Sequence, residues 1–142
     1  MNDKLSIPEY LIKHGVRKTS FRIELLEIFR NNRRGLSHRD IKSQVKSSTD
    51  KVTIYRALDT FLDKGIIHKV PDANNVSRYA LTKTSCNHKD HNHAHFICKK
   101  CEGTFCLNEF ELPIYNDTKG FNIKNTNLIL EGVCPDCSPI IN

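Results

Sequence analysis

Apolar residues along the first 65 positions recur at the spacing of amphipathic helices. The pattern predicts a short helix over Ile7–His14, which Gly15 ends. A second helix follows a cap at Thr19 or Ser20, and the segment NNRRG at 31–35 ends it. One face of this second helix is apolar, through Phe21, Leu25, Ile28 and Phe29.

Two further helices are predicted on either side of the polar segment Ser47–Asp50. Ser37 caps the first of them, which carries the apolar residues Ile41 and Val45. The second runs from Lys51 to Gly65, with apolar residues at helical spacing: Ile54, Leu58, Phe61 and Leu62. Two helices joined by a short turn are the arrangement of a helix-turn-helix.

Two strand-like segments follow, Ile66–Val70 and Arg78–Leu81. The turn-rich segment 71–75 between them predicts a hairpin. Helices that end in a helix-turn-helix and are followed by a hairpin have the order of a winged helix-turn-helix. We therefore predict a winged-helix DNA-binding domain over residues 1–82.

The N-terminal end of the fourth predicted helix carries side chains suited to DNA. This end of a recognition helix reaches the base edges in helix-turn-helix proteins. Arginine can bind guanine or phosphate, and hydroxyl groups can bind phosphate. Arg78 belongs to the predicted wing and Arg17 to an adjacent basic corner. The candidate DNA-binding residues are Arg17, Lys51, Thr53, Tyr55, Arg56 and Arg78.

The charge distribution agrees with this division of the chain. Residues 1–82 contain 16 Lys and Arg against 9 Asp and Glu, whereas residues 83–142 contain 6 against 7. The whole basic excess therefore lies in the first half, which favours a polyanionic partner such as nucleic acid. A basic surface that is merely solvated would show the same charge. All six cysteines lie in the second half.

The second half has shorter elements. The polar segment 83–92 has no periodicity and predicts a hinge, although it carries three potential metal ligands, Cys86, His88 and His91. After it we expect a strand, a knuckle, a strand, a short helix and a final strand, over 93–97, 98–101, 104–107, near 112–118 and over 121–130. The resulting fold class is α+β.

Two Cys-x-x-Cys pairs are the strongest chemical signal in the chain: Cys98 with Cys101, and Cys134 with Cys137. A tight turn in each pair brings both sulfurs to one side of a metal, and four thiolates can close a tetrahedron around one zinc ion. Disulfide bonds or free core thiols are the alternative. The sequence shows no export signal and no membrane-spanning apolar run, so we expect a cytoplasmic protein with one structural zinc per chain.

The segments KVTIYRALDTFLDKGIIHKV, SRYAL, HAHFICKKCEGTF and CPDC resemble the Fur superfamily of metal-responsive bacterial repressors in order and spacing. The resemblance extends from about Gly15 to Cys137. It implies a winged helix that binds palindromic double-stranded DNA and a zinc-binding dimerisation domain over 93–142, so the chain would act as a homodimer. It places Tyr55 and Arg56 at the recognition-helix pair that contacts DNA, and Arg17 at a residue that contacts the minor groove.

The resemblance also implies a second, regulatory metal site at the hinge. His93 and His95 alternate as on a strand and point to one face. Two positions that usually carry carboxylates in the family are Cys86 and Cys106 here, and a further histidine position is Gly35. Two sulfurs and two imidazoles suit zinc better than iron(II) or manganese(II). We therefore expect a zinc-responsive repressor of metal-homeostasis genes, similar to the zinc uptake regulators.

An iron- or peroxide-responsive regulator of the same family is the main alternative. In it, Cys86 and Cys106 would form a disulfide, or bound iron would oxidise the histidine ligands. Cys106 could also be a small buried core residue. The remaining histidines are interpreted as surface, capping or solvated loop residues: His14, His38, His68, His88 and His91.

An enzyme is not expected. A zinc hydrolase or deaminase needs a general base near the metal, commonly a glutamate in a His-x-Glu or His-Glu-x-x-His motif. Neither motif occurs in the sequence. A plain zinc-ribbon interaction module would leave the basic winged-helix half without a role.

Overall fold

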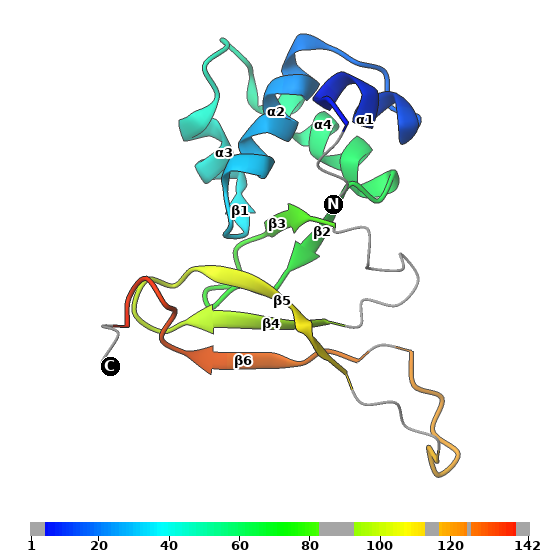
Figure 1. Cartoon of the computed structure of the whole chain (residues 1–142), viewed down its shortest axis with the longest axis vertical. Helices are drawn as coiled ribbons and strands as arrows, with labels where there is room; N and C mark the ends of the chain where they lie inside the picture. The colour runs from blue at the N-terminus through cyan, green and yellow to red at the C-terminus, as the bar shows by residue number, and fades with distance from the viewer. Residues whose placement is uncertain (1–4, 83–92, 113–116, 125, 139–142) are drawn as a thin grey trace.

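A computed structural model describes residues 5–82, 93–112, 117–124 and 126–138 (Figure 1). Four helices lie together above a small sheet, and a second small sheet lies on the other side of the first (Figure 1). This arrangement confirms the predicted α+β fold class. The expected hinge, 83–92, lies outside the described residues, so the domain limits remain a prediction.

The helices follow the predicted pattern to within about two residues at their ends. Their bounds are α1 Ile7–Lys13, α2 Ser20–Asn31, α3 His38–Gln44 and α4 Lys51–Asp63. Thr19 caps α2 and Ser37 caps α3, as predicted, since each side chain accepts a hydrogen bond from a backbone amide of the first turn. None of the described helices has the length and apolar character needed to cross a bilayer.

The turn between α3 and α4 is fixed from α2. The Glu24 carboxylate accepts hydrogen bonds from the backbone amide of Lys46 at 2.5 Å and from the Ser47 hydroxyl at 2.7 Å. The Ser47 hydroxyl bond is the main reason that the pKa of Glu24 lies below its usual value. Asp50 then caps α4 by accepting from the Thr53 amide at 2.8 Å. These contacts set where the recognition-helix candidate begins.

The first sheet has the order β1-β3-β2 with antiparallel neighbours. Its strands are β1 Leu36–Ser37, β2 Ile67–Val70 and β3 Arg78–Leu81. β2 and β3 are the predicted hairpin. β1 was not predicted, because two residues are too few to show an alternating pattern. It places the start of α3 directly beside the wing, with Ser37 opposite Arg78.

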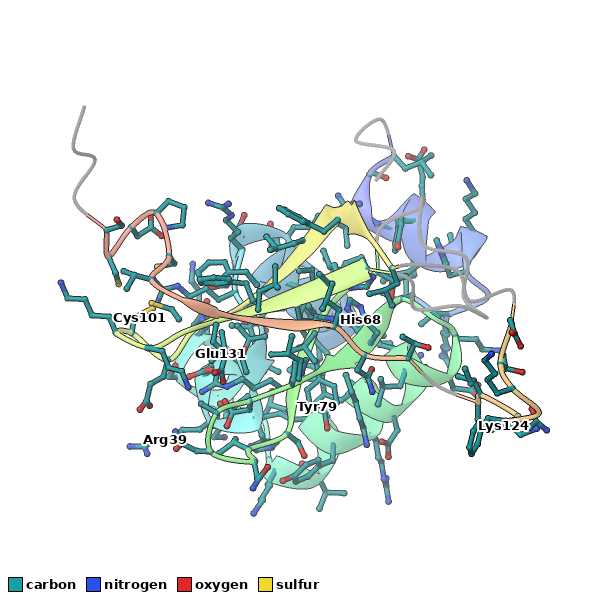
Figure 2. The ribbon with its side chains drawn as sticks, turned by 90° about the horizontal axis from the view of Figure 1, so that it is seen from below. Arg39, His68, Tyr79, Cys101, Lys124 and Glu131 are labelled. Atoms are coloured by element: carbon teal, nitrogen blue, oxygen red, sulfur yellow. The ribbon has the colours of Figure 1, made fainter. Side chains whose placement is uncertain are left out.

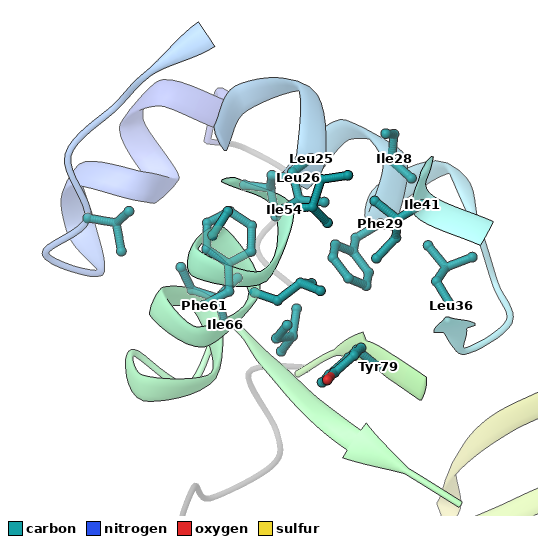
Figure 3. Packing of buried hydrophobic residues seen from close by; sticks show 14 of the residues in the cluster. Leu25, Leu26, Ile28, Phe29, Leu36, Ile41, Ile54, Phe61, Ile66 and Tyr79 are labelled. Atoms are coloured by element: carbon teal, nitrogen blue, oxygen red, sulfur yellow. The ribbon is translucent and has the colours of Figure 1, made fainter. Parts of the chain in front are cut away.

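The main hydrophobic core lies between the helices and the first sheet (Figure 3). Leu25, Ile54 and Phe61 are fully buried there, from the predicted apolar faces of α2 and α4. Tyr79 of β3 closes the core from the wing side (Figure 3). Burial of these faces stabilises the fold by roughly 1.5–3 kcal/mol for each large apolar side chain. The winged-helix half therefore has a core of its own.

The second sheet has β4 in the middle, in the order β5-β4-β6. Its strands are β4 His93–Cys98, β5 Thr104–Glu111 and β6 Ile129–Gly132. β5 is antiparallel to β4, and β6 is parallel to it. The amide of Lys99 also donates to the carbonyl of Gly132 at 2.7 Å. The last strand therefore lies against the first strand of this half, as the sequence predicted.

The predicted strand over 121–130 is wrong for most of its length. β6 begins only at Ile129, and residues 121–124 are not in a strand. Phe121 is 74% exposed and Ile123 50% exposed, so the apolar alternation there does not reflect a sheet with one buried face. The short helix expected near 112–118 falls largely on residues 113–116, which lie outside the described residues.

Several polar contacts join the two halves. The Gly35 amide donates to the Thr104 carbonyl, and the Thr104 hydroxyl donates to the Pro71 carbonyl, each at 2.8 Å. The Asn74 side-chain amide donates to the Glu102 carboxylate at 3.1 Å. The loop before β1 and the loop inside the wing hairpin therefore rest on the end of the second sheet that carries the first Cys-x-x-Cys pair.

Candidate metal centres and nucleic-acid interface

The four paired cysteines meet at one end of the second sheet. Their sulfur atoms all lie within 4.8 Å of one another, and the cluster is Cys98, Cys101, Cys134 and Cys137. Cys98 ends β4, and Cys134 follows β6, so the neighbouring strands bring the two distant pairs together. Cys98 and Cys134 are fully buried. We call this group the four-cysteine cluster.

The protonation of these thiols depends on their neighbours. The backbone amides of Cys101 and Cys134 donate to the Cys98 sulfur at 3.4 and 3.3 Å, and they lower the pKa of Cys98 to about 6. Cys137 is the opposite case: hydrogen bonding to the Cys134 sulfur, followed by burial and the other sulfurs, raises its pKa to about 12. Four adjacent thiolates need a cation between them, and the cluster fits a structural zinc site.

A second cluster lies farther along the second sheet and includes one residue from the first sheet. His68, His93, His95 and Cys106 offer ligand atoms that all lie within 4.8 Å of one another. Figure 2 shows His68 of β2 well apart from Cys101 of the four-cysteine cluster. We call this group the histidine–cysteine cluster. Because His68 belongs to the wing hairpin, the cluster spans both halves of the protein.

The pairing of β4 and β5 brings the three ligands of the second half together. His93 and His95 alternate along β4, and His95 lies opposite Cys106 of β5. The ring centroids of His93 and His95 are 4.6 Å apart, and that of His68 is 5.1 Å from that of His93. All three imidazoles are buried, each less than 8% exposed. Three imidazoles and a thiol, held together in a protein interior, are a suitable ligand set for a transition metal.

The two ring nitrogens of His68 face different partners. Nδ1 lies 3.4 Å from the Thr82 hydroxyl, and Nε2 lies 3.4 Å from the Cys106 sulfur. A polar partner on one nitrogen fixes the orientation of the ring and directs the other nitrogen to the cluster. The interpretation of His68 as a surface or capping residue is therefore wrong, since the side chain is 4% exposed and belongs to the cluster.

The predicted regulatory set is thus brought together in part. His93, His95 and Cys106 lie in one cluster, and His68 joins them. Cys86, His88 and His91 lie outside the described residues, so the role of Cys86 remains a prediction.

The candidate DNA-contacting residues of α4 lie at its exposed N-terminal end. Lys51, Thr53, Tyr55 and Arg56 are exposed, and Tyr55 is 43% exposed. Their buried neighbours Ile54, Ala57 and Leu58 fix the helix against the core. Arg17 is also exposed, in the loop before α2, and its carbonyl accepts a hydrogen bond from Arg22 at 2.9 Å. These five side chains are accessible to a duplex.

Arg78 has a different environment. Its guanidinium forms an ion pair with Asp40 at 2.8 Å and another with Asp72, and it donates to the Gly35 carbonyl at 3.2 Å. The Asp72 side chain is only 2% exposed. Arg78 therefore ties the wing to the start of α3, and this arrangement supports a structural role more directly than the predicted contact with DNA.

Comparison with known proteins shows similarity to metal-dependent regulators. The profile of the Ferric uptake regulator family matches residues 13–131. The ferric uptake regulation protein of Bacillus subtilis is 29% identical over 119 residues, which cover 78% of this chain and 77% of that protein. The zinc uptake regulation protein of Escherichia coli is 26% identical over 132 residues, covering 88% and 75%.

A solved structure agrees with the fold. The structure of the ferric uptake regulator from Francisella tularensis with iron has a TM-score of 0.61 and 26% identity, and the match covers 87% of this chain and 95% of that one. Members of the family are DNA-binding and metal-binding transcriptional regulators, so the expectation that this protein is not an enzyme is confirmed. The family match over 119 of its 142 residues shows that the chain belongs to the Ferric uptake regulator family.

Proposed function

We propose that this metal-dependent transcription regulator is a homodimeric repressor that senses zinc through the histidine–cysteine cluster. The observation that carries the proposal is the origin of the ligands. His68 comes from β2 of the winged-helix half, whereas His93, His95 and Cys106 come from the second sheet. A metal held by this set would cross-link the two halves of the protein.

The chemistry of the ligands favours zinc. Iron(II) and manganese(II) sites are usually richer in carboxylate oxygen and have more ligands, whereas a small set of imidazole and thiolate ligands suits zinc. The cluster contains three imidazoles and one thiol, and no carboxylate takes part in it among the described residues. The four-cysteine cluster would hold a separate, structural zinc ion for the same reason.

The proposed mechanism is thermodynamic linkage between metal and DNA. His68 lies on β2, which follows α4 after a short turn, so its position is coupled to that of the recognition helix. Fixing His68 against β4 and β5 fixes the orientation of α4 relative to the second half. Metal and DNA then strengthen each other's binding by the same factor, typically equivalent to about 1–3 kcal/mol.

Dimerisation through the second half would place two recognition helices on a palindromic operator, in major grooves about one helical turn apart. The second half exposes several large apolar side chains that support this role: Phe110, Phe121, Ile123, Ile129 and Val133. At the DNA, the proposed contacts are those of Arg17, Lys51, Thr53, Tyr55 and Arg56. We place the protein in the cytoplasm because its partner is genomic DNA, and we propose metal-homeostasis genes as its targets.

The test is a metal titration of DNA binding. Metal per chain is first counted by elemental analysis, and a duplex is selected from a random-sequence pool by the metal-loaded protein. Zinc, iron(II) and manganese(II) are then titrated in a chelator-buffered background while the affinity for that duplex is measured. We expect one zinc that resists chelation and a second, weaker zinc that switches DNA binding on. Switching by iron or manganese instead would overturn the choice of metal.

Cys86→Ser and Cys106→Ser test which thiol belongs to the regulatory site. If Cys86 is a ligand, Cys86→Ser abolishes zinc-dependent DNA binding. An unchanged response in Cys86→Ser assigns the site to His68, His93, His95 and Cys106 alone.

An iron- or peroxide-responsive regulator remains the alternative, because the Cys106 thiol is only partly buried and lies beside three imidazoles. Loss of DNA binding on mild peroxide, reversed by thiol reductant, would support it.

A further inference from the structure

The interpretation of His38 as an ordinary surface or capping residue does not describe its environment. Ser37, and not His38, caps α3. The imidazole of His38 instead stacks on the ring of Tyr55, with 4.3 Å between centroids and 26° between planes. Tyr55 belongs to the first turns of α4, where the proposed function places the contact with DNA bases. His38 therefore supports a residue that the proposed interface uses.

The stack places the faces of the His38 and Tyr55 rings against each other. The Nε2 atom of His38 is buried and has no hydrogen-bond partner among the described residues. The contact of this side chain with Tyr55 is made by the face of the ring. Stacked ring pairs stabilise a structure by more than the burial of their apolar area alone.

The position of His38 is itself fixed by the wing. Ser37 pairs with Arg78 across β1 and β3, and the Ser37 amide donates to Asp40 at 3.0 Å. Asp40 in turn pairs with Arg78 at 2.8 Å. His38 lies between Ser37 and Asp40, so it is a rigid support for Tyr55, which is still 43% exposed with the stack in place.

Tyr55 and His38 also share the wall of a groove of about 340 Å³. The groove lies between the start of α3, the start of α4 and the loop before β3, and its lining includes Arg39, Lys51, Val76 and Ser77. No acidic residue of the described chain lines it. Lys51 Nζ lies 5.8 Å from the centre of the Tyr55 ring. A groove with two cations, hydroxyl groups and no carboxylate is complementary to a DNA strand.

We propose that His38 is a positioning residue that holds the Tyr55 ring in the orientation in which it meets a DNA base. The inference rests on the proposed function. A free side chain loses rotamer freedom when it is immobilised against a partner, and this loss weakens binding. The stack removes that freedom before the DNA arrives. His38 thus acts through Tyr55 and sets the preference for the base that Tyr55 contacts.

The test uses the full-length, metal-loaded protein and the duplex that wild-type protein selects from a random-sequence pool. His38→Ala is expected to weaken binding to this duplex about three- to tenfold, in line with the usual strength of a ring pair. Binding to a random duplex should change by less than about twofold, because phosphate contacts dominate there. His38→Phe keeps a ring for stacking and is expected to restore the affinity. His14→Ala is the matched control, since His14 lies at the C-terminal cap of α1, outside the groove that His38 and Tyr55 line.

A double-mutant cycle completes the test. In the Tyr55→Ala background, His38→Ala should have no further effect on the selected duplex. The inference is overturned if His38→Ala binds like wild type, if His38→Phe is as weak as His38→Ala, or if the loss persists without Tyr55. If His38→Ala does not fold, His38→Phe and its cycle with Tyr55→Ala decide the question. Failure of the wild-type protein to select any duplex would overturn the proposed function and this inference together.

Discussion

The backbone amide of Gly35 donates a 2.8 Å hydrogen bond to the carbonyl of Thr104, and so the loop before β1 is joined to the first residue of β5. Thr104 is fully buried, and its hydroxyl donates to the carbonyl of Pro71, which directly follows β2. One buried threonine therefore holds two loops of the winged-helix half. Arg34, next to Gly35, adds a cation–π contact with Phe105 at 5.5 Å.

Gly35→Ala is expected to disturb this junction. A Cβ at position 35 would lie 2.7 Å from Cγ2 of Val70, which is shorter than van der Waals contact allows. Overpacking of this kind costs about 1–3 kcal/mol of unfolding free energy. Calorimetry should show a lower Tm, and zinc should bind the histidine–cysteine cluster more weakly, because Val70 and His68 share the strand β2.

The matched control is Gly132→Ala, whose new Cβ would meet the Phe96 ring at an ordinary 3.4 Å. Equal shifts of Tm in the two variants would show that position 35 has no special role.

His68→Ala tests whether a ligand from the winged-helix half is needed. The variant should lose at least about tenfold in affinity for the second zinc, because one of four candidate ligands is gone. The zinc of the four-cysteine cluster should remain, and zinc should no longer strengthen DNA binding. Competition with a chromophoric chelator measures the zinc affinity, and His14→Ala serves as the control. A variant with wild-type zinc affinity would remove His68 from the site.

The helices were predictable because their signals are local. Ser37 and Thr19 cap the helices that follow them, and the apolar spacing after each cap matches the buried face that the structure shows. The start of the final strand was not predictable, because a strand forms only where it pairs with neighbouring strands. Phe121 and Ile123 alternate like strand residues, yet both are exposed, and the pairing with β4 starts only at Ile129.

The same contrast applies to the metal ligands. Each Cys-x-x-Cys pair is a local signal, so the four-cysteine cluster could be predicted from spacing. His68 could not be assigned in this way, since its partners lie in another sheet. One signal was present: in a strand, His68 and Val70 point to the same face, and Val70 is buried. A histidine on a buried face, in a chain with a His-x-His motif, is a candidate ligand.

Asp72→Asn tests the anchor of the wing. Asp72 accepts hydrogen bonds from the amides of Asn74 and Val76 at 2.7 and 3.0 Å, and it pairs with Arg78. Burial acts to raise the pKa of Asp72, but the Val76 amide and the Arg78 guanidinium outweigh it, so the pKa lies below its ordinary value of 3.8. The variant should lose about 1–3 kcal/mol of unfolding free energy at pH 7.

The pH dependence of this difference has a definite sign. A carboxylate with a lowered pKa in the folded state stabilises the fold above its unfolded pKa, and the contribution is lost as the pH falls through the folded value. Wild type and Asp72→Asn should therefore differ fully above about pH 5, and the difference should begin to shrink below about pH 4 as the pH approaches the lower, folded pKa. Denaturant unfolding at several pH values measures this, with the exposed Asp63→Asn as control. A difference that stays constant down to pH 3 would assign the effect to packing and not to charge.

Removal of one ligand from the four-cysteine cluster should destabilise the second half of the protein. The buried cluster there is small, with Cys98, Phe105 and Cys134 as its buried members, so a bound metal must supply much of its stability. Cys137→Ser should release the structural zinc and lower Tm by at least about 10 °C, the shift that roughly 3 kcal/mol produces in a chain of this length. Cys106→Ser, which leaves the four-cysteine cluster intact, should keep this zinc and most of the Tm. Elemental analysis and calorimetry on both variants separate the two centres, and a Cys137→Ser protein that retained tightly bound zinc and its Tm would show that the cluster is not a structural metal site.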